Sequence, residues 1–224
     1  VCHVLRYTSY PAAIQKLIRD GEIGEIVSIH DAVLDRVSDG TGFVFDHTYD
    51  ELSKLDFGFK FSERYRGLKI VLFEDILKKF SCQTIMNIHV KTMSDEYNPE
   101  SMKKIVDLVR RYDCEKHCYF MIAHDGVVKM FKEYAPDIKI CLGHRDERPW
   151  GIVDAAIELG CEKVQFYNEF YNQEMVDKAR AHGIICNYFH SEVPEEAAKL
   201  VEMGMDTILT NDYNVVSQAI KRNK

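Results

Sequence analysis

The sequence lacks any apolar run that approaches the roughly 20 residues needed to span a bilayer, and its start shows no charged segment followed by an apolar one. We therefore expect a soluble protein with no membrane span. An excess of positive charge is also missing, because 29 Lys and Arg residues stand against 36 Asp and Glu residues, for a net charge of -7. Without a basic stripe to neutralise phosphates, nucleic acid is not expected as a partner.

The chain has no Gly-x-Gly-x-x-Gly loop, so we expect no nicotinamide cofactor. Its cysteines are odd in number and lie mostly in or beside apolar runs, which favours buried thiols over a disulfide framework and indicates a cytoplasmic protein. Cys114 and Cys118, with His117 between them, could suggest a metal clip. A structural zinc site needs four ligands, however, and no second pair stands at matching spacing.

From Lys69 onward, short β-rich runs alternate with longer amphipathic stretches, the pattern of repeated βα units around a parallel sheet. The expected strands are Thr84–Val90, Cys118–Ala123, Ile138–Leu142, Lys163–Tyr167, Ile184–Phe189 and Thr207–Thr210. The expected helices are Glu100–Tyr112, Ile152–Leu159, Gln173–His182 and Glu195–Met203. Glycines at 160, 183 and 204 follow the last three helices, where a left-handed residue ends a helix.

Before Lys69 the rhythm differs. We expect a strand at Val1–Arg6, a helix at Pro11–Arg19 and a strand at Glu25–His30. Together these give roughly eight strands, which predicts an α/β fold of the (β/α)₈ TIM-barrel type as a single domain over residues 1–224. The irregular stretch Asp31–Gly67 is an insertion after the second strand, of the kind that often carries function.

Histidines collect where the expected strands end, the edge at which barrels of this type place their active sites. Five of the nine histidines in the chain follow this rule, which is more than scattered placement would give. The ends carry His30 and Asp31, His89 and Lys91, His124 and Asp125, His144 and Arg145, Tyr167 to Glu169, His190, and Asn211 and Asp212. Imidazole serves as acid, base or metal ligand, although a single His at a strand end is more often structural.

The run from His30 to Phe61 resembles the glycerophosphodiester phosphodiesterase family. That family typically shows His-Asp, Leu-Asp-Arg, Gly-Thr-Gly, Glu-Leu and Leu-Asp-x-Gly in order. Here they stand as His30-Asp31, Leu34-Asp35-Arg36, Gly40-Thr41-Gly42, Glu51-Leu52 and Leu55-Asp56-Phe57-Gly58. Asn87-Ile88-His89-Val90-Lys91 is similar to the family's Asn-Ile-Glu-x-Lys strand, and the resemblance continues diffusely to the C-terminus.

The resemblance implies a barrel of the phospholipase-C-like phosphodiesterase type and a hydrolase of lipid metabolism. Such enzymes cleave glycerophosphodiesters to glycerol phosphate and an alcohol with a divalent cation, commonly calcium or magnesium. His30 matches one of two catalytic histidines, while Lys91 and Asp31 fall at the phosphate. The expected partner is therefore a small-molecule phosphodiester, and the sequence makes no prediction of the oligomeric state.

The sequence also departs from the family. The family's opening His-Arg-Gly strand, Pro-Glu-Asn-Thr helix and Glu-x-Asp strand are missing, and His89 replaces the carboxylate of the later strand. In their place, residues 1–29 resemble a βαβ piece of the glucose-fructose oxidoreductase-like dehydrogenases, through His3, Leu5-Arg6-Tyr7 and the run Gly21–Ile29. This pattern suggests a chimera with its junction near Ile29-His30 and a degenerate active site.

Two functions stay open at this point. In the first, the chain is an active phosphodiesterase in which His3 takes the role of the missing histidine beside His30. A cation would then need new ligands, and His89, His124, Asp125 and Glu169 form a nitrogen and oxygen set suited to zinc or manganese. In the second, it is a non-catalytic barrel that acts as a binding or structural module. Tyr167, Tyr188 and Trp150 could supply an apolar wall for an alcohol, although such aromatics more often serve packing.

Overall fold

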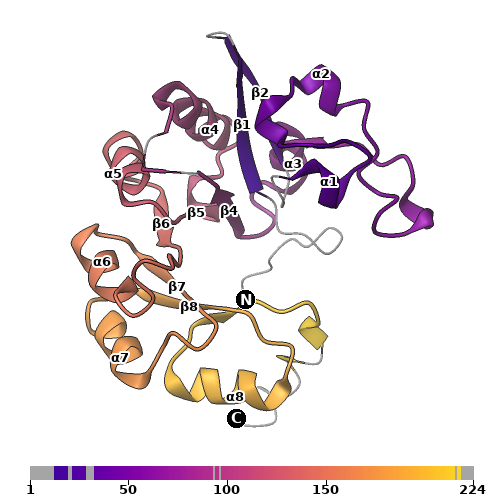
Figure 1. Ribbon diagram of the computed structural model, residues 1–224. Helices are drawn as coiled ribbons and strands as arrows, with labels where there is room; N and C mark the ends of the chain where they lie inside the picture. The colour runs from indigo at the N-terminus through magenta and orange to yellow at the C-terminus, as the bar shows by residue number, and fades with distance from the viewer. Residues whose placement is uncertain are drawn as a thin grey trace. The chain divides into compact units, whose positions relative to one another are not determined.

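The fold comes from a computed structural model that describes residues 13–19, 22–28, 33–92, 94–95, 97–214 and 216–217. The described residues form two compact units, one that runs to Cys118 and one that begins at Tyr119. Both are α/β units in which helices accompany a sheet (Figure 1). In the described ranges, no helix combines the length and the apolar character needed to cross a membrane.

The sheet of the first unit has the strand order β3-β2-β1-β4. Its elements are β1 (Ala13–Arg19), β2 (Glu22–Ser28), β3 (Val71–Leu72), α3 (Phe73–Phe80), β4 (Met86–Val90) and α4 (Pro99–Arg111). β1 and β2 form an antiparallel hairpin, β3 extends it on the side of β2, and β4 joins β1 in parallel. The parallel register sets Ala13 opposite His89.

The predicted helix at Pro11–Arg19 is therefore wrong for residues 13–19. The apolar residues Ile14, Leu17 and Ile18 fit a helical face, but the backbone pairs with β2 and β4 instead. Long-range strand pairing here overrides local helix propensity. The second expected strand is present but runs over Glu22–Ser28. A tight hairpin replaces the βαβ path that the dehydrogenase resemblance implied for these residues, and Val1–Arg6 lies outside the described residues.

The insertion between β2 and β3 holds only short helices, as its irregular sequence predicts. They are α1 (Leu34–Val37), η1 (Val44–Asp46), α2 (Tyr49–Leu52) and η2 (Glu63–Tyr65). A small core of its own holds the segment together, made of Leu34, Val37, Val44, Leu52 and Ile70. Thr48 caps α2 in a capping box with Glu51. In Figure 1 the insertion lies beside the β1–β2 hairpin, and α2 and η1 contact it.

The second unit contains a fully parallel sheet in the order β5-β6-β7-β8-β9. After the short helix η3 (Glu115–His117), its elements are β5 (Cys118–Ile122), α5 (Asp125–Tyr134), β6 (Lys139–Leu142), α6 (Ile152–Glu158), β7 (Lys163–Tyr167), α7 (Gln173–Ala181), β8 (Ile185–Phe189), α8 (Pro194–Met203) and β9 (Thr207–Ile208). Figure 1 shows α6 and α7 against β7 and β8.

The expected strands and helices from residue 84 onward are confirmed, and each observed end lies within two residues of the expected one. The helix α5 was not predicted, although Val127, Val128 and Phe131 give it a buried face. Gly204 ends α8 with a φ of 102°, as expected of a left-handed C-terminal residue. Because these βα repeats are all parallel, the carboxyl ends of all strands in the second unit lie at the same edge of its sheet.

Candidate functional site

The end of β4 carries three polar side chains on one face of the strand. Asn87, His89 and Lys91 alternate in sequence with apolar residues, so a strand directs all three to the same side. His89 is buried, and Lys91 lies exposed directly after the strand. The amide oxygen and nitrogen of Asn87 are both buried without a hydrogen-bond partner among the described residues. This face therefore offers a cation at its outer end and unsatisfied polar groups below it.

The end of β5 is fixed by an ion pair. Asp125 is the first residue of α5, and its carboxylate contacts the guanidinium of Arg148 through both oxygens, at 2.6 Å each. Arg148 also donates to the carbonyl oxygen of Ala123, at 3.4 Å. His124 precedes Asp125 at the N-cap position. The pair joins the β5–α5 turn to the loop after β6, so Asp125 has a structural partner already.

Aromatic rings line the ends of β6, β7 and β8. We call this the aromatic strip, and its members are Trp150, Phe170, His144, Tyr167, Phe189 and His190. His144 stacks on Phe170 with centroids 5.5 Å apart and lies 5.1 Å from Tyr167. Trp150 meets Phe170 edge-on at 5.7 Å, and more than half of its side chain is exposed. The six rings contact one another in series beside the carboxyl ends of these strands.

Tyr188 does not belong to the strip. It follows Asn187 on the strand and precedes Phe189, so it points to the opposite face of the sheet. There it is buried against Tyr171, and its hydroxyl donates to the carbonyl oxygen of Asn168. Of the three aromatics considered for an apolar wall, Tyr167 and Trp150 are in the strip, whereas Tyr188 is a packing residue.

Carboxylates flank the aromatic strip. Asp146 lies 3.3 Å from His144, and Glu147 lies 3.3 Å from Arg145. Glu169, which follows β7, is exposed. The pKa of the Glu147 carboxyl is lowered, first by a hydrogen bond from its own backbone amide and then by the hydrogen bond from Arg145. Charged side chains of both signs therefore lie beside the strip.

A metal centre does not emerge from the described residues, among which no three His, Cys, Asp or Glu side chains gather closely enough to hold an ion. His89 lies on β4, His124 and Asp125 start α5, and Glu169 follows β7; their role as ligands stays a prediction. The predicted catalytic residues His30 and His3, and the predicted phosphate residue Asp31, lie outside the described residues.

Cys114 and Cys118 form a buried pair of thiols beside η3. A hydrogen bond from Cys118 lowers the pKa of Cys114 to about 7, and the same contact raises the pKa of Cys118. Both cysteines are free, which agrees with the sequence-based expectation of buried thiols. The pair contacts one another and Ser81 rather than a third metal ligand, so the described structure gives no support to a metal clip at this position.

Sequence reasoning missed Arg148, Asn87 and Phe170. Arg148 stands in the polar loop Arg145–Arg148, where nothing distinguishes a partner of Asp125 from a solvated charge. Asn87 lay within the strand resemblance, and its spacing from Lys91 could have marked it as facing the same side. Phe170 follows Glu169 in a short loop, and only the folded chain brings its ring onto His144.

Comparison with known proteins decides the family. Residues 19–215 match the Glycerophosphoryl diester phosphodiesterase family. The chain belongs to this family. It is 25% identical over 204 residues to a glycerophosphodiester phosphodiesterase of Caldanaerobacter subterraneus subsp. tengcongensis, a match that covers 89% of this chain and 82% of the relative. A glycerophosphodiester phosphodiesterase of Bacillus subtilis is 24% identical over 210 residues, with 84% and 69% of the two chains covered.

Solved structures show the same fold. A glycerophosphoryl diester phosphodiesterase structure from Silicibacter pomeroyi superposes with a TM-score of 0.78 at 16% identity and covers 95% of this chain and 82% of its own. A phosphodiesterase from Oleispira antarctica, in complex with the product sn-glycerol-3-phosphate, gives a TM-score of 0.77 at 18% identity, with 93% and 84% covered. The chain thus has the α/β fold of this phosphodiesterase family.

The family match also bears on the N-terminal part. It begins at residue 19 and so includes β2, which lies before the junction expected near Ile29-His30. None of the matches reported above points to a dehydrogenase, and β1 and β2 form a hairpin. The family membership is therefore supported across most of the chain, and the idea of a chimera gains no support.

Proposed function

We propose that this protein hydrolyses glycerophosphodiesters to glycerol phosphate and an alcohol. The observation that carries the proposal is the family match over residues 19–215, which includes His30-Asp31 and the strand that precedes Lys91. The relatives that bear this activity in their names match over most of their length. By analogy with the relative that holds sn-glycerol-3-phosphate, we propose a glycerol phosphate site at the carboxyl edge of the sheet.

In the proposed mechanism, His30 and His3 exchange protons with the oxygen of the attacking water and the oxygen of the leaving alcohol. One imidazole takes a proton from the attacking water as its oxygen bonds to phosphorus, and the other donates a proton to the alcohol oxygen as its bond to phosphorus breaks. Lys91 would offset negative charge that develops on the phosphoryl oxygens, because it stands exposed at the end of β4. Asp31 would lie at the phosphate, as the resemblance implies.

A divalent cation, which family members typically use, would supply further charge stabilisation. The fit of His89, His124, Asp125 and Glu169 to such an ion is incomplete, since Arg148 already holds Asp125 and the described residues form no group of three ligands. The mechanism above therefore rests on the protein's own side chains, and a mixed nitrogen and oxygen set would favour zinc or manganese over calcium or magnesium.

We further propose that the strands close into a (β/α)₈ barrel that forms a single domain, as the family fold and the repeated βα units support. The free thiols of the described cysteines agree with a cytoplasmic location. In this barrel the aromatic strip would receive the alcohol portion of the diester, because apolar rings and flanking carboxylates suit a group that is partly apolar or positively charged.

A non-catalytic barrel is the second candidate, and the lack of a metal-holding group among the described residues favours it. The two are separated by measuring glycerol phosphate released from glycerophosphocholine with calcium, magnesium, manganese or zinc added in turn. We expect turnover that His30→Ala and Lys91→Met reduce by about a hundredfold or more. His182→Ala, an exposed histidine at the C-terminal end of α7, is the matched control. A folded wild type that is inactive with every cation would establish the non-catalytic barrel.

A further inference from the structure

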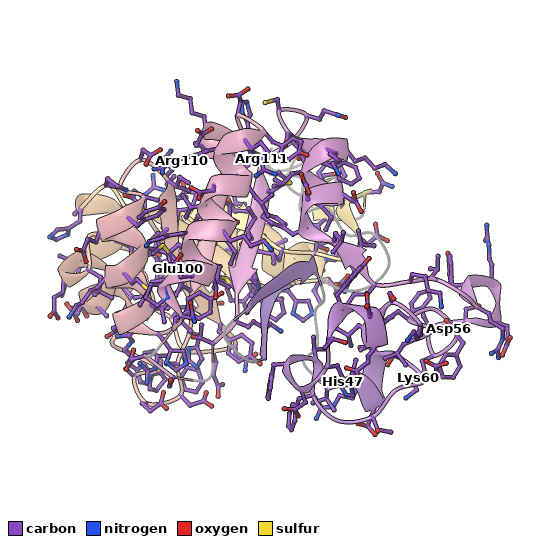
Figure 2. The ribbon with its side chains drawn as sticks, turned by 90° about the horizontal axis from the view of Figure 1, so that it is seen from above. His47, Asp56, Lys60, Glu100, Arg110 and Arg111 are labelled. Carbon is purple, nitrogen blue, oxygen red and sulfur yellow. The ribbon has the colours of Figure 1, made fainter. Side chains whose placement is uncertain are left out.

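The insertion presents an exposed loop from Asp56 to Gly67 that the mechanism does not use. Its ends are close together, because the carboxylate of Asp56 accepts a hydrogen bond from the backbone N–H of Gly67 at 2.8 Å. The same carboxylate accepts from Gly58 at 2.8 Å and from Phe59 at 3.2 Å. Compact surface loops closed in this way are frequently functional. Figure 2 shows Asp56 and Lys60 on this part of the first unit.

Close packing across the loop fixes its shape. A Cβ added at Gly58 would lie 1.7 Å from the carbonyl oxygen of Tyr65, so the two sides of the loop touch through their backbones. Phe61 packs against Tyr65 with ring centroids 5.4 Å apart. Outside the loop, the N–H of Phe57 donates to the carbonyl oxygen of Leu68 at 2.8 Å. These contacts hold the two sides of the loop together.

What the loop presents is both apolar and positively charged. Phe61 and Leu68 are each 47% exposed, although large apolar side chains are usually covered. The segment from Asp56 to Lys69 carries four basic residues, Lys60, Arg64, Arg66 and Lys69, against the acids Asp56 and Glu63. In a chain with a net charge of -7, this is a local reversal of sign.

The positive charges stay available at the surface. Lys60 contacts the carbonyl oxygen of Asp35, and Lys69 donates to those of Lys54 and Leu55, which are neutral partners. Arg64 lies over the ring of Tyr65 with its guanidinium exposed. Only Arg66 is paired with an acid, Glu63, at 2.7 Å. The carboxylate of Asp56 is turned toward backbone amides.

We propose that the Asp56–Gly67 loop, with Leu68 and Lys69, is a docking element for an anionic lipid surface. Such a surface offers phosphate groups to Lys60 and Arg64 and an interfacial region to Phe61 and Leu68, whereas nucleic acid or an acidic protein surface would leave the aliphatic and aromatic side chains without a partner. Because one loop is a small anchor, the attachment is weak, reversible and sensitive to salt.

The test is co-sedimentation of the full chain with vesicles of phosphatidylglycerol or of phosphatidylcholine at low and at raised salt. We expect binding to phosphatidylglycerol vesicles alone, with loss as salt rises. Lys60→Gln together with Arg64→Gln should weaken the partitioning about tenfold or more, and Phe61→Ser should also weaken it. Lys129→Gln together with Lys139→Gln is the matched control, since it removes the same charge from exposed positions of the second unit.

Several results would overturn the proposal: no binding of wild type to phosphatidylglycerol vesicles, an equal loss in the control variant, or capture by heparin in place of vesicles. Hydrolysis of soluble glycerophosphocholine is measured in parallel, because it depends on the proposed function and vesicle binding does not. The loop variants should retain it. A raised KM for this soluble substrate with unchanged vesicle binding would assign the loop to substrate contact and reject docking.

Discussion

Asp125 and Arg148 lie 23 residues apart in the chain and face each other with two nitrogen–oxygen contacts of 2.6 Å. Their side chains are only 35% and 20% exposed, so the pair is partly shielded from solvent. A charge-assisted contact of this geometry fixes the start of α5 relative to the loop after β6. It also explains why Asp125 is a poor candidate for a cation ligand while Arg148 remains in place.

We expect Asp125→Asn to lower the free energy of unfolding by about 1–3 kcal/mol, because it leaves the shielded guanidinium of Arg148 without its counter-charge. Denaturant unfolding measures the loss. Asp154→Asn is the control, since Asp154 pairs with Lys178 at an exposed position and should cost about 0.5 kcal/mol or less. The double variant Asp125→Asn with Arg148→Met should regain most of the lost stability, because no unpaired guanidinium remains. Equal losses of unfolding free energy for Asp125→Asn and Asp154→Asn would refute the assignment.

The Asp56–Gly67 loop should open at acid pH. Backbone hydrogen bonds, that from Gly58 first, hold the pKa of the Asp56 carboxyl below its ordinary value of 3.8. A carboxyl with a lowered pKa stabilises the fold above its ordinary value, and this contribution is lost as the pH falls through the lowered pKa. We therefore expect the hydrogen-exchange protection of the Gly67 amide, measured by NMR, to stay constant from neutral pH to about 4 and to decrease at lower pH.

Asp56→Asn supplies the comparison for this pH dependence. The amide retains one acceptor oxygen but has no charge to titrate, so protection at Gly67 should be low at every pH between neutral and acid. Asp50→Asn, at an exposed position of α2, should leave the profile of the wild type unchanged. A wild-type loop whose protection does not respond to acid would contradict the role given to Asp56.

Gly204 should tolerate a side chain less well than Gly183. Both follow a helix with positive φ, 102° and 71°, so alanine is strained at each. At Gly183 the added Cβ meets open space, whereas at Gly204 it would lie 3.0 Å from Cδ of Arg180, which also donates to the Gly204 carbonyl oxygen. We expect a loss of about 1 kcal/mol for Gly183→Ala and about 2 kcal/mol for Gly204→Ala in thermal or denaturant unfolding. Equal losses would show that the Arg180 contact yields freely.

The local signals of the second unit were enough to predict its strands and most of its helices. Lys163–Tyr167 was bounded correctly because β-rich residues stand between turn residues, and Gly204 marked the end of α8. The β1–β2 hairpin was missed because the apolar residues of AIQKLIR have helical spacing without strand-like alternation, and only pairing with β2 and β4 selects the strand.

The strand ends that carry candidate residues were predictable, but the contacts of those residues were not. The rule that strands end at one edge predicted that His124 and Tyr167 stand at the ends of β5 and β7, and the structure has them there. The partner of Asp125 and the stacking of His144 on Phe170 depend on loops whose path the sequence does not encode in any local pattern. Tyr188 is a packing residue, the role that aromatics at strand ends more often have, because its position in β8 turns it away from the strip.

If the aromatic strip receives the alcohol of the substrate, Trp150 should set a preference among alcohols. Trp150 is 53% exposed at the end of the strip, and the carboxylate of Asp146 lies 3.3 Å from His144 of the same strip. Aromatic faces and carboxylates attract a quaternary ammonium group more than a neutral polyol. We expect Trp150→Ala to raise the KM for glycerophosphocholine about three- to tenfold, with little change in kcat or in the KM for glycerophosphoglycerol.

Phe43→Ala is the matched control, because Phe43 is an exposed ring of the insertion, stacked on Phe45 and outside the strip. It should leave both KM values unchanged. An equal rise for the two substrates in Trp150→Ala would mean that the ring serves general positioning, and no rise for either would remove the strip from the substrate site. Since Trp150 is largely exposed, unfolding of the variant should match wild type within about 0.5 kcal/mol, which separates a lost contact from a lost fold.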